Sequence, residues 1–217
     1  TYADLCIDFD LWQGESDAAQ YIPALLTLLR EKHLLRHSDG ALVTDVTTPF
    51  DNPPLPPVLL QNKNGGSTYA ATDLAAVMQR QKDFAPNQIW YIVDKRQHLH
   101  FQQVFRCAEK AGVAAPGVLR HLEFGTMNGR NGKPFKTRDG GVMQLSELFN
   151  AVYHSAYDRL KNSPHSPKPS IADTAHDLAV AAIKFGDLCN HRSKDYIFDP
   201  EKFLAKEGKS GGFLLYT

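Results

Sequence analysis

The sequence predicts an α/β fold in which a parallel sheet is followed by a smaller, mostly helical segment. Strand-like and helix-like patterns alternate over residues 58–125, which is the order expected of a parallel sheet. The most apolar stretch, residues 88–94, is typical of a strand buried on both faces. Helical spacing dominates later in the chain, so we place the two domains at residues 1–143 and 144–217.

The first part of the chain predicts a helix, a strand and a loop. Apolar residues at one-face spacing predict a helix over residues 17–36, despite Pro23 near its start. Asp39-Gly40 ends the helix, and a short strand follows at residues 41–46. Five prolines within residues 49–57 exclude regular structure and predict a loop.

The middle of the chain carries the alternation on which the sheet depends. Asn64-Gly65-Gly66 is a turn sequence, Thr72 is a good N-cap, and Gly112 is a natural helix end. The elements in order are a strand pair at 58–60 and 67–69, a helix at 72–84, a strand at 88–94, a helix around 101–108 and a strand at 118–125.

Helical patterns dominate the last part of the chain. Its elements are a helix with Ser146 as N-cap, an exposed linker at 162–170, a helix at 171–186 that Gly186 ends, an aromatic segment at 195–200 and a short helix at 201–207.

Charge and composition limit the class of protein. Twenty-four Lys and Arg balance 24 Asp and Glu, which argues against a general nucleic-acid binder. Three cysteines lie far apart, which excludes a cysteine-based zinc site and predicts small buried hydrophobes. The absence of an apolar run of membrane-spanning length and of a leader pattern predicts a cytoplasmic protein without a membrane partner.

A cationic stretch flanked by glycines occupies residues 132–141. Lys133, Lys136 and Arg138 place three positive charges close together, and the glycines allow backbone angles that other residues resist. Such a loop can close over a polyphosphate. From composition alone the alternative is a solvated connection between a strand and a helix.

Five blocks stand out by their order and spacing: STYAATDLA at 67–75, DKRQHLHFQ at 94–102, FGTM at 124–127, GKPFKTR at 132–138 and DYIFD at 195–199. Together they resemble bacterial arginyl-tRNA synthetase, a class I aminoacyl-tRNA synthetase. The resemblance runs from Gly14 to Gly208 and is weak at residues 49–57 and around His165.

The resemblance implies a Rossmann-type catalytic sheet, of which this chain holds the second half, and a helical connecting segment. It also implies an enzyme that joins L-arginine to ATP, with Mg²⁺ accompanying the nucleotide, and then transfers arginine from the arginyl-adenylate to tRNA(Arg). We expect the full-length enzyme to be a monomer.

The resemblance assigns the arginine pocket to Tyr69, Asp73 and Gln97, with Glu15 as a second carboxylate. Carboxylates and planar acceptors suit the forked guanidinium, which an ammonium group cannot match. Each residue has an alternative role: Asp73 as a favourable charge at a helix N-terminus, Tyr69 as strand core, Gln97 as an uninvolved first-turn residue and Glu15 as part of a polar helix cap.

The resemblance assigns ATP contacts to His100, Gly125 and Met127, the last two through backbone groups near the adenine. The alternative for His100 is a helix residue satisfied by solvent or backbone. No metal site is predicted, because His98 and His100 are two apart on a helix and point about 200° apart.

Lys133, Lys136, Thr137 and Arg138 are the catalytic candidates of the cationic stretch. They match the second class I signature, Lys-Met-Ser-Lys-Ser, only loosely, since Thr137 stands where the second lysine belongs. Mobile donors near the leaving pyrophosphate can serve the same chemistry, so the particular cation stays open.

The first class I signature, His-x-Gly-His, does not occur in the 217 residues, and neither do the family's N-terminal tRNA-binding and C-terminal anticodon-binding domains. We therefore expect an incomplete, inactive fragment of an arginine-tRNA ligase. Two other interpretations are a stand-alone, non-catalytic module that binds arginine or a protein partner, and an unrelated nucleotide-binding domain with no preference for arginine over lysine.

Overall fold

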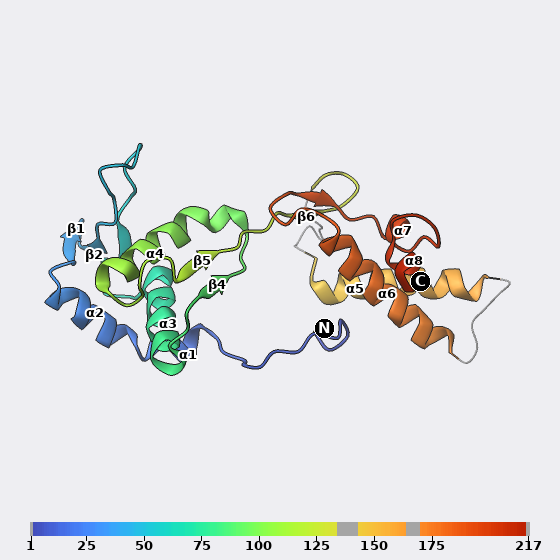
Figure 1. Cartoon of the computed structure of the whole chain (residues 1–217), viewed down its shortest axis with the longest axis horizontal. Helices are drawn as coiled ribbons and strands as arrows, with labels where there is room; N and C mark the ends of the chain where they lie inside the picture. Colours follow the sequence, from blue (N-terminus) through green and yellow to red (C-terminus); the bar gives the residue numbers. More distant parts are fainter. Residues whose placement is uncertain (1, 134–142, 164–169, 216–217) are drawn as a thin grey trace. The chain divides into compact units, whose positions relative to one another are not determined.

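The computed structural model describes residues 2–133, 143–163 and 170–215 (Figure 1). Contacts divide the chain into two compact units. We call Leu11–Glu123 the N-unit, and Phe124–Thr217 together with Thr1–Asp10 the C-unit. The domain boundary between residues 143 and 144 stays a prediction.

The N-unit begins with two short helices, and the single helix predicted at residues 17–36 is wrong. The helices are α1 (Glu15–Ala19) and α2 (Ile22–Glu31). Pro23 lies in the first turn of α2, where its missing N–H is not needed, so a new helix can start there. The chain leaves α2 at His33, whose φ of 55° is left-handed.

The residues after α2 form a three-stranded antiparallel sheet, β1-β2-β3, with strands Arg36–Ser38, Ala41–Thr44 and Val58–Gln61. Asp39 and Gly40, both with positive φ, turn the chain between β1 and β2. The strand predicted at residues 41–46 is therefore confirmed. Among the described residues β3 pairs with β2, so its predicted place in a parallel sheet is wrong.

Helix α3 (Tyr69–Phe84) starts three residues earlier than predicted. Thr68, not Thr72, is its N-cap, because the Thr68 hydroxyl accepts a hydrogen bond from the backbone of the first turn. The strand predicted just before the helix is reduced to one bridge between Gln61 and Ser67.

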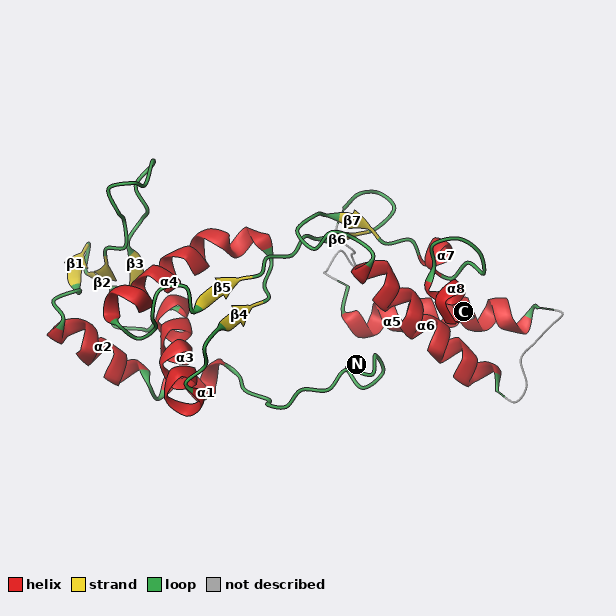
Figure 2. Ribbon diagram, in the orientation of Figure 1, coloured by secondary structure: helices red, strands yellow, loops and turns green. Residues whose placement is uncertain are grey.

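Strand β4 (Ile89–Tyr91), helix α4 (His98–Ala111) and strand β5 (Leu119–His121) form the strand-helix-strand unit that the sequence predicts. β4 and β5 pair in parallel, as the arrows of Figure 2 show. Burial of β4 on both faces is not observed, because Trp90 is 59% exposed. The short helical turn η1 (Lys95–Gln97) joins β4 to α4.

The core of the N-unit brings together side chains from α2, α3, α4 and the strands. Helices α3 and α4 pack against each other across it. Burial of an aliphatic side chain stabilises a fold by about 1.5–3 kcal/mol. The fully buried aliphatic residues include Leu25, Leu29, Leu60, Leu74 and Val104.

The proline-rich loop at residues 49–57 has no regular structure, as predicted, but it is anchored to α4. Arg106 donates two hydrogen bonds to the carboxylate of Asp51. These bonds hold the pKa of Asp51 well below its usual range. Gln103 Nε2 adds a hydrogen bond of 2.8 Å to the carbonyl of Pro56.

The C-unit is mostly helical, as predicted. Helices α5 (Leu145–Lys161) and α6 (Ile171–Leu188) pack along each other (Figure 1). Its other elements are the parallel pair β6 (Met127–Asn128) and β7 (Tyr196–Ile197), then α7 (Pro200–Phe203), which is shorter than the helix predicted at 201–207, and α8 (Gly211–Leu215).

Two helix boundaries in the C-unit differ from the prediction. Gln144, not Ser146, precedes α5, since its backbone N–H donates to the Glu147 carboxylate at 2.8 Å. Gly186 does not end α6. A Cβ at this position would lie 2.6 Å from the Phe198 ring, so the glycine permits close packing instead.

The three cysteines are free, and their burial differs. Cys107 is buried, and burial raises the pKa of its thiol to about 11. Cys6 and Cys189 are exposed, so the prediction of buried hydrophobes is wrong for both. Within the described part of the chain, no helix has the length and apolar character needed to cross a bilayer.

Candidate functional site

Tyr69 and Asp73 lie on one face of α3, because residues four apart on a helix are neighbours. The start of the helix is fixed by Thr68, whose hydroxyl donates a 2.5 Å hydrogen bond to the carbonyl of Leu59 in β3. Tyr69 is 75% exposed, which excludes a role as strand core in the N-unit. Its ring is therefore available to a ligand that approaches Asp73.

The carboxylate of Asp73 is held by His100 of α4. The two atoms Asp73 Oδ2 and His100 Nε2 lie 2.6 Å apart, and both side chains are half-buried. A carboxylate only accepts, so Nε2 carries the proton and donates it. Asp73 Oδ1 accepts no hydrogen bond from the described residues, and the carboxylate can still accept a second donor there.

Tyr91 and Arg80 complete the surroundings of Asp73. Arg80 Nη1 donates to the Tyr91 hydroxyl at 2.9 Å. Burial raises the pKa of Tyr91, the charge of Asp73 adds to this effect, and Arg80 opposes it. Neither residue was predicted from the sequence. Arg80 could have been found at two helical turns from Asp73, whereas the approach of Tyr91 depends on how β4 packs against α3.

Gln97 precedes His100 by three residues and is the N-cap residue of α4. Asp94 fixes this turn, because its side chain accepts a 2.8 Å hydrogen bond from the backbone of Arg96. Gln97 and His100 therefore lie on neighbouring positions of the same helix face. We call Tyr69, Asp73, Gln97 and His100 the α3–α4 site.

Glu15 is exposed in the first turn of α1, which packs against α3. Its neighbour Asp17, not Glu15, accepts the hydrogen bond from Gly14 that caps the helix, at 2.7 Å. The alternative role of Glu15 as a cap is thus filled by Asp17. Its part in arginine binding stays a prediction.

Gly125 and Met127 belong to the C-unit, where their observed contacts are with their own unit. A Cβ on Gly125 would lie 2.3 Å from the Lys194 backbone, and the Gly125 N–H donates to the carbonyl of Arg192 at 2.9 Å. Met127 is in β6 and pairs with Tyr196 of β7. The contacts that these residues were predicted to make with ATP stay predictions.

Lys133 is exposed next to a tight turn. The carbonyl of Lys133 accepts from the N–H of Gly129 at 2.9 Å, and Gly132 has a φ of 71°. Arg130, which was not predicted as a site residue, donates hydrogen bonds of 2.7 Å to Asp199 and to Glu201. The catalytic candidates Lys136, Thr137 and Arg138 lie outside the described residues.

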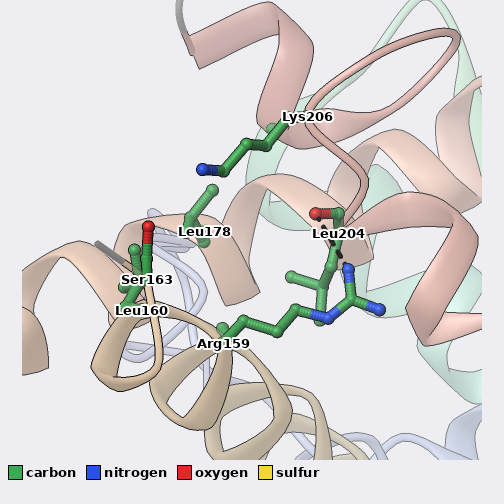
Figure 3. Close-up of a pocket in the computed structure, with 8 residues that line it drawn as sticks. Arg159, Leu160, Ser163, Leu178, Leu204 and Lys206 are labelled. Carbon is green, nitrogen blue, oxygen red and sulfur yellow. Dashed lines mark hydrogen bonds between the residues drawn. The ribbon is translucent and has the colours of Figure 1, made fainter. Parts of the chain in front are cut away.

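A cavity of about 360 Å³ lies in the C-unit (Figure 3). Leu160, Leu178 and Leu204 make it largely apolar. Arg159 donates a 3.4 Å hydrogen bond to the carbonyl of Leu204, and Lys206 extends along the opposite side. None of the predicted site residues that the structure describes lines it.

Comparison with known proteins gives the class first. Residues 1–200 match the family model described as tRNA synthetases class I (R), catalytic domain, so the chain belongs to the class I aminoacyl-tRNA synthetases and, within them, to this arginine family. The fold, with its helices and small parallel sheets, agrees with that class. The resemblance seen in the sequence blocks is therefore confirmed.

The particular relatives carry the name arginine–tRNA ligase. Those of Alkaliphilus oremlandii and Agathobacter rectalis are 44% and 43% identical to this chain, and each match covers all of it but only 37% of the relative. The chain thus spans about 37% of the length of these curated relatives.

Solved structures agree in fold. Arginyl-tRNA synthetase of Plasmodium falciparum superposes with a TM-score of 0.79 at 27% identity, covering 99% of this chain and 35% of that one. The Thermus thermophilus enzyme superposes with a TM-score of 0.76 over 99% of this chain and 42% of its own. At 21% identity the second comparison supports the fold alone.

Proposed function

We propose that this chain is part of an arginine–tRNA ligase, in which the α3–α4 site recognises the guanidinium group of L-arginine. One observation carries the proposal: in a chain of the arginine family, the half-buried carboxylate of Asp73 is held by His100 beside the exposed ring of Tyr69. A fixed carboxylate on an open helix face suits a cation with several directed donors.

Each member of the α3–α4 site has a distinct part in this proposal. Asp73 accepts from the guanidinium through the oxygen that His100 does not occupy. Tyr69 offers an aromatic face, on which a planar cation can stack, and Gln97 an amide oxygen. His100 acts through Asp73 as a positioning residue. Glu15 supplies a second carboxylate from α1.

Discrimination against lysine follows from the same geometry. An ammonium is a compact point charge and cannot satisfy acceptors that are spaced for a planar fork. The acceptors left unpaired would then carry a desolvation cost, which lowers the affinity for lysine.

In the proposed reaction, the carboxylate oxygen of arginine attacks the α-phosphorus of ATP, and pyrophosphate leaves. Gly125 and Met127 would contact the nucleotide, and the contact of His100 with ATP, separate from its hold on Asp73, stays a prediction. Lys133, Lys136, Thr137 and Arg138 would supply donors to the leaving pyrophosphate. Arginine then passes from the adenylate to tRNA(Arg).

Mg²⁺ would accompany ATP and neutralise phosphate charge. Mg²⁺ keeps water and phosphate oxygens as ligands, so it needs few ligand groups from the protein. The described residues of the α3–α4 site, with Asp73 as their carboxylate, are compatible with this requirement.

The proposal extends to the domain organisation and to the state of the full-length protein. The β4–β5 pair would be part of a Rossmann-type sheet within a partial catalytic domain at residues 1–143, and residues 144–217 would form a helical connecting segment. We propose a cytoplasmic enzyme that is monomeric at full length. We also propose that the 217-residue polypeptide alone does not charge tRNA, since it spans only about 37% of its relatives.

The test is arginine-dependent exchange of pyrophosphate into ATP by the full-length ligase that contains this segment. Asp73→Asn is expected to lower kcat/KM for arginine about 100-fold, because it removes a charged acceptor of the guanidinium. Asp83→Asn, at the other end of α3, is the matched control and should stay within about twofold. Equal kinetics in both variants would contradict the proposal.

A further inference from the structure

Two imidazoles and one carboxylate cluster at the carboxyl ends of the parallel strands in the N-unit. His121 is the last residue of β5, Glu123 follows it by two, and His98 is the first residue of α4. One potential ligand atom from each lies within 4.8 Å of those of the other two. His98 lies beside Glu123, whereas His100 lies beside Asp73. The cluster and the Asp73–His100 pair therefore have no side chain in common.

The imidazole of His121 is in the tautomer that a metal ligand needs. Its Nε2 lies 3.1 Å from the carbonyl oxygen of Val93, which can only accept, so Nε2 carries the proton. The lone pair is then on Nδ1. That atom is buried and has no hydrogen-bond partner among the described residues.

A buried acceptor without a partner is rare, because it carries a desolvation cost. In metal sites the same arrangement is usual: one ring nitrogen binds the ion while the other donates to a backbone carbonyl that fixes the ring. The ring of Phe101, with its centroid 5.1 Å from that of His121, further restrains its orientation.

The other two side chains can adjust around this fixed nitrogen. His98 Nδ1 and Glu123 Oε2 are 3.6 Å apart; His98 is exposed and Glu123 is half-buried. Metal–ligand bonds of about 2.0–2.2 Å bring tetrahedral donors to about 3.5 Å from one another. Rotation of the exposed His98 side chain can supply this contraction without movement of the backbone.

We propose that His98, His121 and Glu123 bind a divalent transition-metal ion of the zinc type, with a fourth coordination position open to water. Two imidazoles and one carboxylate are a donor set that Zn²⁺ accepts, whereas Mg²⁺ and Ca²⁺ prefer oxygen ligands only. The ion would link the end of β5 to the start of α4. It requires neither arginine nor ATP, so its test is independent of the proposed reaction.

The experiment titrates Zn²⁺ and Co²⁺ into the 217-residue chain. Cys6→Ser and Cys189→Ser are introduced first, because exposed thiols also bind these ions. We expect calorimetry to show one equivalent of bound Zn²⁺. Tm should rise with Zn²⁺ but not with equimolar Mg²⁺. Bound Co²⁺ should show intense visible absorption from low-symmetry coordination.

Variants of His98 and Glu123 identify the site. His98→Ala and Glu123→Gln should each weaken Zn²⁺ binding by about 10-fold or more. His37→Ala, which removes an exposed histidine from β1, is the matched control and should stay within about twofold.

His121 is tested without substitution, because its ring packs in the N-unit. Zn²⁺ should shift the nitrogen resonance of His121 Nδ1 while Nε2 keeps its proton. Absence of stoichiometric binding, unchanged affinity in both ligand variants, or a Zn²⁺-induced shift confined to other histidines would each overturn the proposal.

Discussion

The N-unit and the C-unit fix their candidate residues by different means. In the N-unit one side chain orients another through a hydrogen bond, as His100 does for Asp73 at 2.6 Å. In the C-unit close packing of two backbone segments fixes the residue, as between Gly125 and the backbone of Lys194. Substitutions should therefore change ligand binding in the first unit and folding in the second.

The largest effect is expected from Gly125→Ala, which would break the backbone contact. The new Cβ would lie 2.3 Å from main-chain atoms that have no rotamer to change, so the C-unit should lose about 3 kcal/mol of unfolding free energy. Urea unfolding measures this loss. Gly14→Ala, where the structure leaves room, is the control. Wild-type stability of Gly125→Ala would show that the close approach is dispensable.

A smaller effect is expected at the side-chain contact of the N-unit. His100→Leu removes the donor to Asp73 and should weaken arginine binding about 10-fold, the usual consequence of losing one charge-assisted hydrogen bond. His100→Gln retains an N–H donor and should recover part of the affinity. Calorimetry measures the Kd for arginine in each variant, and unfolding curves show whether each variant is folded. If Leu and Gln behave alike, His100 does not act by positioning Asp73.

The smallest effect concerns acid stability of the N-unit. The pKa of Asp51 is lowered in the folded state by Arg106, so this pair stabilises the fold above the unfolded value of about 3.9 and the contribution fades as pH falls below it. Between pH 5 and 3, Tm should fall more steeply for the wild type than for Asp51→Asn. Asp45→Asn, which removes the more exposed pair with Arg36, should change the slope less. Parallel curves for wild type and Asp51→Asn would contradict this.

The sequence predicted the elements better than their partners. The strand-helix-strand unit around α4 and the helical C-unit follow from local periodicity, which packing reinforces. The pairing of β3 with β2 and of β6 with β7 did not follow, because strand partners depend on contacts distant in sequence. The predicted start of a helix was wrong where two N-cap candidates lie one helical turn apart, as Thr68 and Thr72 do.

The candidate site was predicted from sequence blocks, not from periodicity. Tyr69 and Asp73 could not be placed on one helix face in advance, because the predicted helix began at Thr72 and left Tyr69 in the preceding strand. The contact of His100 with Asp73 could not be predicted either, since it requires the packing of α3 on α4. The cluster of His98, His121 and Glu123 was missed for the same reason, because its members come from two elements.

The most direct test of arginine recognition by the α3–α4 site is the affinity of the 217-residue chain for arginine and lysine, measured side by side by calorimetry for the wild type and Asp73→Asn. We expect the wild type to prefer arginine and the preference to disappear in Asp73→Asn, because the fixed carboxylate supplies it. Equal binding of arginine and lysine by the wild type, or an unchanged preference in the variant, would contradict it.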